Sequence, residues 1–337
     1  MEQLDNLVVS SRVRLARNLE SVPFKTKMKG AFDALAGTIK TQNKDFVSTY
    51  TSDLSPEMAQ ALYEQHLISR ELLNNKANSV IVANDVSAKN PNKVIVMLGE
   101  EDHIRIQSLQ VGFGIDKAFA SAKKIADDIE AKHDIAWRKE FGYLTSCPTN
   151  LGTGMRASVM MFLPALTISG DMQHIAGQLS NQNLVVRGVY GEGSEAGGYL
   201  YQISNQACFG HTEKQIIEMV KTVAVQIANL EFRAQSQMYK RDPDQIVDAV
   251  MRSWGLLTNA YMISSSEAVE NLAMLKIGVN LGIIKFKNQS GRILDDLFSI
   301  IQPQTLATVD NRASAVTSRD KIRATRITEL LKSSRIN

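Results

Sequence analysis

The pattern of the sequence changes near residue 240, and this change limits the possible folds more than any other feature. Before it, short segments rich in β-branched and aromatic residues, bounded by Gly, Asn or Pro, alternate with helical patterns. The predicted strands cover residues 79–83, 93–98, 184–190 and 199–203. We therefore expect residues 1–238 to form an antiparallel sheet flanked by helices, in the α+β class.

Two helical patterns lie between these strands or follow them. Residues 112–132 form the first. The second runs from Thr212 to about Tyr239 and opens with a Thr-x-x-Gln capping box. It places Ile216 and Val220 on one face, as expected of a helix that covers a sheet.

Only helical patterns follow the charged segment 240–244, so residues 239–337 are predicted to form a helical C-terminal domain. Pro243 suits the first position of a helix that starts at Asp242. Candidate N-caps predict roughly four or five helices here, and they are Ser264–Ser266, Ser290 and Ser318.

Size and charge exclude several classes of protein. The chain has 337 residues, 44% of them hydrophobic, which is enough for a sizeable core. Its 38 basic and 35 acidic residues are well mixed, so neither a nucleic-acid-binding tail nor a polybasic membrane anchor is expected. The first residues lack the pattern of a secretory signal, and no apolar run approaches the roughly 20 residues that cross a bilayer, so we expect neither a leader nor a membrane span. Two cysteines do not require a disulfide framework, so a reducing cytoplasm is expected.

Arginines and acids cluster at two places. Arg12 and Arg14 alternate on an extended segment, so both guanidinium groups point from one face, where they could bind phosphate. The alternative is a solvated strand face paired with acids. Arg105 follows the acidic segment 100–102, whose carboxylates could hold a cationic guanidinium and accept its proton. The alternative there is an acidic surface turn.

The segment 147–158 joins a lone thiol, two loop glycines and an arginine, just before an apolar run. Arg156 lies close enough in sequence to lower the pKa of the Cys147 thiol, although an inert buried cysteine is the alternative. The sequence has no P-loop and no protein-kinase signature, so bound phosphate would have to be held by arginines.

Residues 191–196 formally fit the Gly-x-Gly-x-x-Gly/Ala dinucleotide fingerprint. That fold needs a helix to follow, whereas residues 199–204 have a strand pattern. We expect instead a hairpin loop that closes over a substrate and brings Glu192 into the site.

Four segments, 10–14, 100–105, 147–158 and 187–192, together resemble the phosphagen (guanidino) kinase family, and the resemblance extends over about residues 7–230. It implies that ATP is bound by a cage of arginines, with His66 against the base and Mg²⁺ among the phosphates, held mainly by water and nucleotide. No metal-binding residues of the protein are predicted. The implied ATP-binding residues are Ser10, Ser11, Arg12, Val13, Arg14, His66, Arg105, Arg156, Ala157, Ser158, Val159, Met160, Arg187, Gly188, Val189, Tyr190 and Gly191.

The resemblance also implies the catalytic residues. Glu101 and Glu192 would clamp the guanidinium of the substrate so that one nitrogen lies in line with the γ-phosphorus. Cys147 matches the reactive cysteine of the family, near the same guanidinium.

The residues of these motifs are most similar to those of the protein-arginine kinase branch of this family. The first motif begins at Ser10, without the N-terminal helical domain of about a hundred residues that small-molecule phosphagen kinases carry. Membership of this branch implies that the substrates are proteins with exposed arginines, among them a heat-shock repressor. It also implies that phosphorylated proteins pass to the Clp ATPase/protease and that the zinc-binding protein McsA is an activator. A homodimer or higher homo-oligomer is expected, with no direct nucleic-acid or membrane partner.

The C-terminal region contains the Arg-Asp-x-x-Arg-Ala motif of this branch, implied to bind phosphoarginine at an allosteric site. Its residues are Arg319, Asp320, Arg323 and Ala324. The two arginines would share a helix face, so that two guanidinium groups could meet one phosphoryl group. The alternative is an ordinary salt-bridged helix end.

Two other functions remain open at this point. The chain could phosphorylate free arginine or another small guanidino compound with the same site. It could also be an inactive phosphoarginine-binding adaptor, although every motif residue is present.

Overall fold

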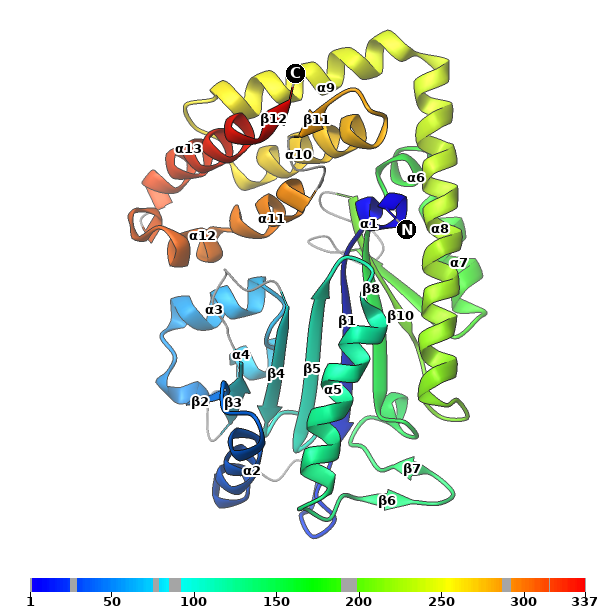
Figure 1. Ribbon diagram of the computed structural model, residues 1–337, viewed down its shortest axis with the longest axis vertical. Helices are drawn as coiled ribbons and strands as arrows, with labels where there is room; N and C mark the ends of the chain where they lie inside the picture. Colours follow the sequence, from blue (N-terminus) through cyan, green and yellow to red (C-terminus); the bar gives the residue numbers. More distant parts are fainter. Residues whose placement is uncertain are drawn as a thin grey trace.

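An eight-stranded sheet forms the centre of the computed structural model, which describes residues 2–24, 29–74, 79–84, 92–188, 199–286, 292–314 and 316–336 (Figure 1). The strand order is β2-β3-β4-β5-β1-β8-β10-β9, and all neighbouring pairs are antiparallel. This confirms the predicted α+β class. The strands are β1 Val8–Arg17, β2 Val47–Tyr50, β3 Val80–Ala83, β4 Lys93–Leu98, β5 Ile104–Val111, β8 Met155–Phe162, β9 Leu184–Gly188 and β10 Leu200–Asn205.

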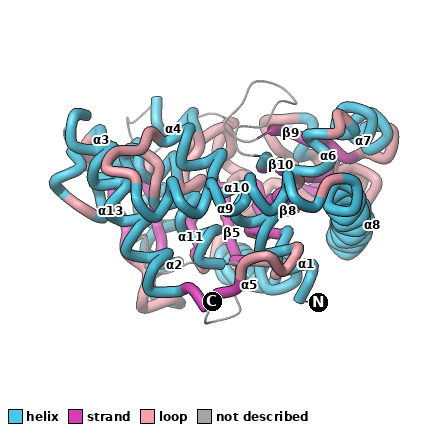
Figure 2. Tube along the Cα trace, turned by 90° about the horizontal axis from the view of Figure 1, so that it is seen from above, coloured by secondary structure: helices cyan, strands magenta, loops and turns pink. Residues whose placement is uncertain are grey.

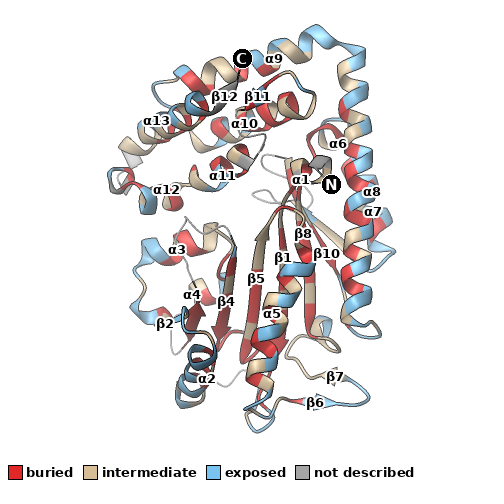
Figure 3. Cartoon of the chain, in the orientation of Figure 1, coloured by how far each residue is buried: buried red, intermediate tan, exposed pale blue. Residues whose placement is uncertain are grey.

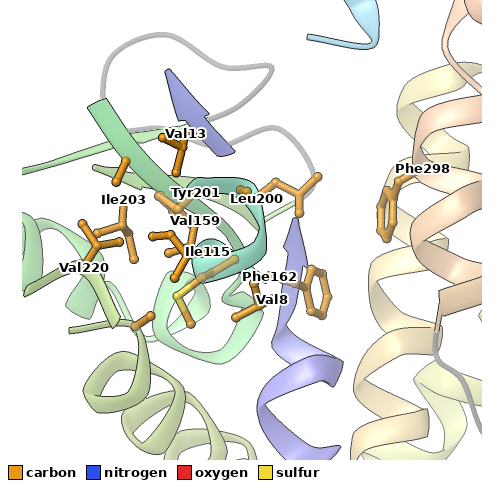
Figure 4. Packing of buried hydrophobic residues seen from close by; sticks show 14 of the residues in the cluster. Val8, Val13, Ile115, Val159, Phe162, Leu200, Tyr201, Ile203, Val220 and Phe298 are labelled. Carbon is orange, nitrogen blue, oxygen red and sulfur yellow. The ribbon is translucent and has the colours of Figure 1, made fainter. Parts of the chain in front are cut away.

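Long helices cover one face of this sheet. They are α2 (Lys29–Gln42), α5 (Ile115–Glu130) and α8 (Glu213–Arg241). The predicted capping box is present at the start of α8, where Thr212 and Gln215 bond reciprocally. Buried residues line the strands and the inner sides of the helices (Figure 3). Figure 4 shows this core, in which apolar side chains of three strands meet those of two helices, with Val13, Val159 and Ile203 facing Ile115 and Val220.

The opposite face is only partly covered. Helices α3 (Pro56–Glu64) and α4 (Arg70–Asn74) pack on β3 and β4 through a second apolar cluster. Side chains alternate between the two faces of a strand, so the same alternation that fills the core leaves polar side chains along β5, β1, β8 and β10 on this open face. The shorter elements are α1 Glu2–Leu7, η1 Thr51–Asp53, β6 Trp137–Arg138, β7 Gly142–Tyr143, η2 Pro148–Asn150, α6 Pro164–Ile168 and α7 Asp171–Ser180.

The C-terminal part is helical, as predicted. The chain passes directly from α8 into the next helix at Asp242, whose side chain accepts a hydrogen bond from the Gln245 amide, with Pro243 in the first turn. Its elements are α9 Pro243–Asn259, α10 Ser265–Asn280, β11 Lys285–Phe286, α11 Arg292–Ile300, α12 Pro303–Val309, η4 Asn311–Ser314, α13 Val316–Ser334 and β12 Arg335–Ile336.

The predicted caps have different outcomes. Ser264 caps α10 as expected. The prediction for Ser318 is wrong, because this residue lies inside α13 and its hydroxyl donates to the carbonyl of Arg312. Ser290 lies outside the described residues.

The helical part lies over one end of the sheet, above β4, β5 and β1 (Figure 1). Seen from that end, α9, α10 and α13 extend across the molecule (Figure 2). The two parts meet in a common core, where the Phe162 ring of β8 packs on Phe298 of α11 with a centroid distance of 6.2 Å. Within the described ranges, no helix is both long and apolar enough to cross a bilayer.

Candidate active site

Four arginines converge on the open face of the sheet because of strand alternation and register. Arg12 and Arg14 leave β1 on this face, while Val13 between them enters the core. Arg14 is paired with Arg156 of β8, and Arg105 of β5 is paired with Ala16, the next residue of β1 on this face. Three adjacent strands thus supply guanidinium groups to one area.

This gathering of positive charge is unfavourable by itself. The pKa of Arg14 lies well below its usual value because of burial and then the charges of Arg12, Arg105 and Arg156. Burial and the charges of Arg105 and Arg156 lower the pKa of Arg12 to about 10. The pKa of Arg156 is also lowered, first by burial and then by Arg187, an exposed residue of β9. Like charges directly opposite each other destabilise a sheet, so the arrangement is suited to a bound polyanion.

The acidic segment before Arg105 separates its three carboxylates. Glu100 is buried, and one of its oxygens lies 2.6 Å from the Arg105 guanidinium, while burial raises its pKa. Asp102 is fully buried and accepts hydrogen bonds of 2.7 Å from the Asn18 side chain and from the Ser146 amide. Glu101 alone remains partly exposed, 3.4 Å from Arg105. Of the three acids, Glu101 lines the smaller cavity described below, and Glu101 is the one that the resemblance assigns to the substrate.

The Cys147 loop is held against the end of β1. Asp102 fixes it through Ser146, and the Cys147 sulfur lies 3.0 Å from the Thr149 hydroxyl. Gly154 has a φ of +63°, and a Cβ at this position would lie 2.6 Å from the carbonyl oxygen of Ala16. Glycine is therefore required for the loop to approach the strand so closely. Both cysteines are free thiols.

Two cavities follow one another along β1. The smaller, of about 80 Å³, is lined by Arg14, Glu101, Arg105, Cys147 and Arg156, together with Thr149 and Asn150 of the loop. It therefore joins two of the three predicted catalytic residues to three of the predicted phosphate-binding arginines.

The larger cavity, of about 290 Å³, begins at the next residues of the same strand face, Ser10 and Arg12. Ser158, Met160 and His66 also line it, as the sequence predicted for nucleotide contacts. His66 has a φ of +58°, and burial, with a smaller effect of Arg12, lowers its pKa to about 4. Its imidazole is consequently neutral at physiological pH.

Some predicted ATP-binding residues are placed elsewhere. The side chains of Val13, Ala157 and Val159 belong to the core on the helical face of the sheet. The Ser11 hydroxyl also points to that face, where it donates to the carbonyl of Gly112 and accepts from the Gly114 amide. These four side chains lie on the other face because alternate residues of a strand point to opposite faces. The prediction that these residues bind ATP could then hold only through their backbone, and it stays a prediction. Gly188 ends β9 beside Arg187, and Val189, Tyr190, Gly191 and Glu192 lie outside the described residues.

The predicted allosteric motif lies on α13, but its geometry differs from the expectation. Arg323 is 2% exposed, and its guanidinium donates to the carbonyls of Ile301 (2.9 Å) and Ile263 (2.8 Å) and to Asp320. Arg319 donates to the carbonyl of Ala313 at 3.0 Å, and Ala324 is buried. The two arginines share a helix face, but neighbouring elements cover that face. In this conformation both guanidinium groups donate to backbone carbonyls, and the binding of phosphoarginine by this motif stays a prediction.

Sequence reasoning missed several residues that line the larger cavity. Gln202 of β10 accepts a hydrogen bond of 2.7 Å from Arg12, and its alternation with Tyr201 could have indicated it. Asp295, Asp296, Phe298, Ser299 and Ile300 come from α11 in the C-terminal part. No local sequence signal links α11 to β1.

Comparison with known proteins agrees with this site. Residues 25–234, more than half of the chain, match the family model "ATP:guanido phosphotransferase, C-terminal catalytic domain". The chain belongs to this family. Residues 243–337 of the kinase match a second model, "Protein-arginine kinase McsB C-terminal domain".

The relatives of the kinase identify its branch. It is 41% identical over 311 residues to a protein-arginine kinase of Caldanaerobacter subterraneus subsp. tengcongensis, covering 89% of this chain and 90% of that protein. It is 40% identical over 338 residues to the protein-arginine kinase of Bacillus subtilis, covering 97% and 90%.

Solved structures of more distant kinases share the fold. A lombricine kinase matches with a TM-score of 0.55 and 24% identity, over 67% of this chain and 66% of that one. The duplicated taurocyamine kinase from Schistosoma mansoni, with bound transition state analog components, matches with a TM-score of 0.59 and 24% identity, over 78% and 39%.

Proposed function

We propose that the kinase transfers the γ-phosphoryl group of ATP to a guanidinium nitrogen of arginine side chains in proteins, giving phosphoarginine and ADP. The observation that carries this proposal is the smaller cavity, where Arg14, Arg105 and Arg156 border the same space as Glu101. Such a space suits both an anionic phosphoryl group and a cationic guanidinium.

The residues of the smaller cavity would divide the chemistry between them. The arginines neutralise the charge that spreads over the γ-phosphate oxygens, and Glu101 orients the guanidinium by accepting its hydrogen bonds. A nitrogen–phosphorus bond forms, the bond from phosphorus to the ADP oxygen breaks, and the guanidinium proton passes to a base. Glu101 is our candidate for that base, with Glu192 as the second clamp and Cys147 beside the guanidinium.

The nucleotide would extend from the smaller cavity into the larger one. Its triphosphate lies along Arg12 and Arg14, with Arg187 at the edge, and its base lies near His66. Among the described residues, no group of three or more His, Cys, Asp or Glu side chains could hold a metal ion. We expect Mg²⁺ to enter with ATP, held mainly by phosphate oxygens and water, as is usual for this ion.

Proteins, rather than free arginine, are proposed as substrates because of the branch to which the kinase belongs, whose relatives are named protein-arginine kinases. The same membership supports a cytoplasmic enzyme that acts on a heat-shock repressor, with the Clp ATPase/protease and the activator McsA as partners, and a homodimer or higher homo-oligomer. The motif from Arg319 to Ala324 remains our candidate for phosphoarginine sensing. This would require α13 to rearrange, because Arg323 is now bonded to carbonyl groups.

The test uses the purified chain, Mg-ATP and an unfolded arginine-rich protein, with free arginine in a parallel reaction. Mass spectrometry under non-acidic conditions should find phosphoarginine on the protein and unchanged free arginine. Phosphorylation of free arginine alone would contradict the proposal in favour of a small-molecule kinase, and no product in either tube, with McsA present, would favour an adaptor.

Glu101→Gln tests the role of the carboxylate. It should lower kcat by about 10²–10⁴-fold, because the general base is lost, while ATP binding stays within twofold. Glu140→Gln, at an exposed residue between β6 and β7, is the matched control and should leave both unchanged. Near-normal activity of Glu101→Gln would show that another group performs this step.

A further inference from the structure

Helix α11 of the C-terminal domain forms one wall of the larger cavity. Asp296, Ser299 and Ile300 line the same space as Arg12 and His66. We propose that this face of α11 is a nucleoside-binding wall, so that the helical C-terminal domain contributes directly to binding the base and ribose of ATP. The inference rests on the proposed function, because it takes the arginines to bind the phosphates.

The composition of the two cavities assigns the nucleoside to the larger one. Three arginines border the smaller cavity, where the phosphates are neutralised. The larger cavity has apolar sides that include Leu109, Met160 and Leu200, together with polar side chains such as Ser158 and Gln202 that could hydrogen-bond a base or ribose. A volume of about 290 Å³ is near the lower end of the usual size of small-molecule sites, in which apolar walls bury the ligand and polar groups orient it.

Aromatic packing and a buried ion pair hold the wall against the sheet. Phe298 of α11 contacts Phe162 of β8, and Lys276 of α10 lies 5.4 Å from the same Phe162 ring. Lys276 and Asp295 form a buried salt bridge that joins α10 to α11. Removing one partner of such a pair leaves an uncompensated charge, so the pair fixes how the two helices are placed.

A second connection joins the wall to the segment that carries His66. One carboxylate oxygen of Glu64 accepts hydrogen bonds from the amides of Gln304 (3.0 Å) and Thr305 (2.8 Å), at the start of α12. These amides have no partner within their own helix, so Glu64 satisfies them. Glu64 itself lines the larger cavity. Movement of the α11–α12 corner would consequently disturb the base-binding side of the cavity.

A third connection ties the wall to α13. The Arg323 guanidinium donates to the carbonyl of Ile301, directly after the end of α11. The position of the wall thus depends on the packing of the C-terminal domain as a whole.

The test compares two ligands that differ only in the nucleoside, a non-hydrolysable ATP analogue and inorganic tripolyphosphate, by isothermal titration calorimetry of the full chain with Mg²⁺. Ser299→Trp places a large side chain on the wall. It should raise the Kd for the ATP analogue at least tenfold and leave the Kd for tripolyphosphate within twofold. Ser333→Trp, at an exposed position of α13, is the matched control and should change neither. Ser299→Leu should give a smaller loss in the same direction, and it serves if the Trp variant does not fold.

Each outcome separates the wall from the arginines. An unchanged Kd for the ATP analogue in both Ser299 variants would overturn the wall, and so would equal losses for the two ligands. If wild type binds the ATP analogue but not tripolyphosphate, and the Ser299 variants bind the analogue more weakly, the proposed phosphate-binding role of the arginines is wrong. The nucleoside-binding role of α11 is then still supported. Failure of wild type to bind either ligand would overturn both.

Discussion

Arg12 offers a test of whether the site is strained without its ligand. Burial and the charges of Arg105 and Arg156 lower its pKa to about 10. Against an ordinary value of 12.5, and at about 1.4 kcal/mol per pKa unit, keeping this guanidinium charged costs the folded protein about 3–4 kcal/mol. Because the unfolded chain binds the proton more tightly, this cost is present in full at neutral pH. The Arg12 side chain also borders a cavity, where solvent screens its charge, so this energetic cost is an upper limit.

Arg12→Met removes the charge but keeps much of the volume. The variant also loses the 2.7 Å hydrogen bond to Gln202, worth about 1.5–3 kcal/mol for a charged donor. The difference predicts that the ligand-free variant is as stable as wild type or up to about 2 kcal/mol more stable. A bound polyanion offsets the repulsion in wild type, so tripolyphosphate should stabilise the variant less than wild type.

Urea denaturation with and without tripolyphosphate measures both effects. Arg138→Met is the matched control, since Arg138 is exposed and pairs with Glu20 far from the other arginines. It should leave the stabilisation by tripolyphosphate unchanged. A loss of more than about 1 kcal/mol in ligand-free Arg12→Met, or equal stabilisation of the variant and wild type, would refute the account of Arg12 as a strained anion ligand.

Two further predictions follow from buried groups near the site. Asp102→Ala removes two charge-assisted hydrogen bonds, so the free energy of unfolding should fall by about 3–5 kcal/mol. Because one of these bonds holds the Cys147 loop, Cys147 should also react faster with iodoacetamide. A urea midpoint equal to that of the exposed control Asp134→Ala would contradict this prediction. In the folded protein the pKa of His66 is about 4, below its ordinary value of 6.5. As the pH falls from about 6.5 to about 4, His66 is protonated in the unfolded chain but not in the folded protein, so the free energy of unfolding should fall over this range. In urea titrations across this pH range, His66→Gln should lose less stability than wild type, whereas the control His174→Gln should behave like wild type. A pH dependence of His66→Gln equal to that of His174→Gln would refute the prediction.

The parts of the fold with local signals could be predicted. The capping box at Thr212, the helix start at Asp242 and the placement of Arg12 and Arg14 on the same strand face all depend on residues within a few positions of each other. The side chains of Ser11 and Val13 lie away from the cavities because the motif was assigned to the site as a contiguous unit, whereas strand alternation sends every second side chain to the other face. The pairing of Arg14 with Arg156 depends on the register between β1 and β8, which neither segment determines by itself.

The amino-acid sequence by itself determined the elements of the kinase and the chemistry of its motifs, because hydrophobic period, caps and residue type are local properties. Only the tertiary structure decided which motif residues meet. It also gave the three acids different places: Glu100 forms a salt bridge with Arg105, Glu101 lines the smaller cavity, and Asp102 accepts a hydrogen bond from the Cys147 loop. It also buried Arg323 and brought α11 against the nucleotide cavity. These contacts join residues far apart in the chain, and their energy comes from packing and burial that no single segment contains.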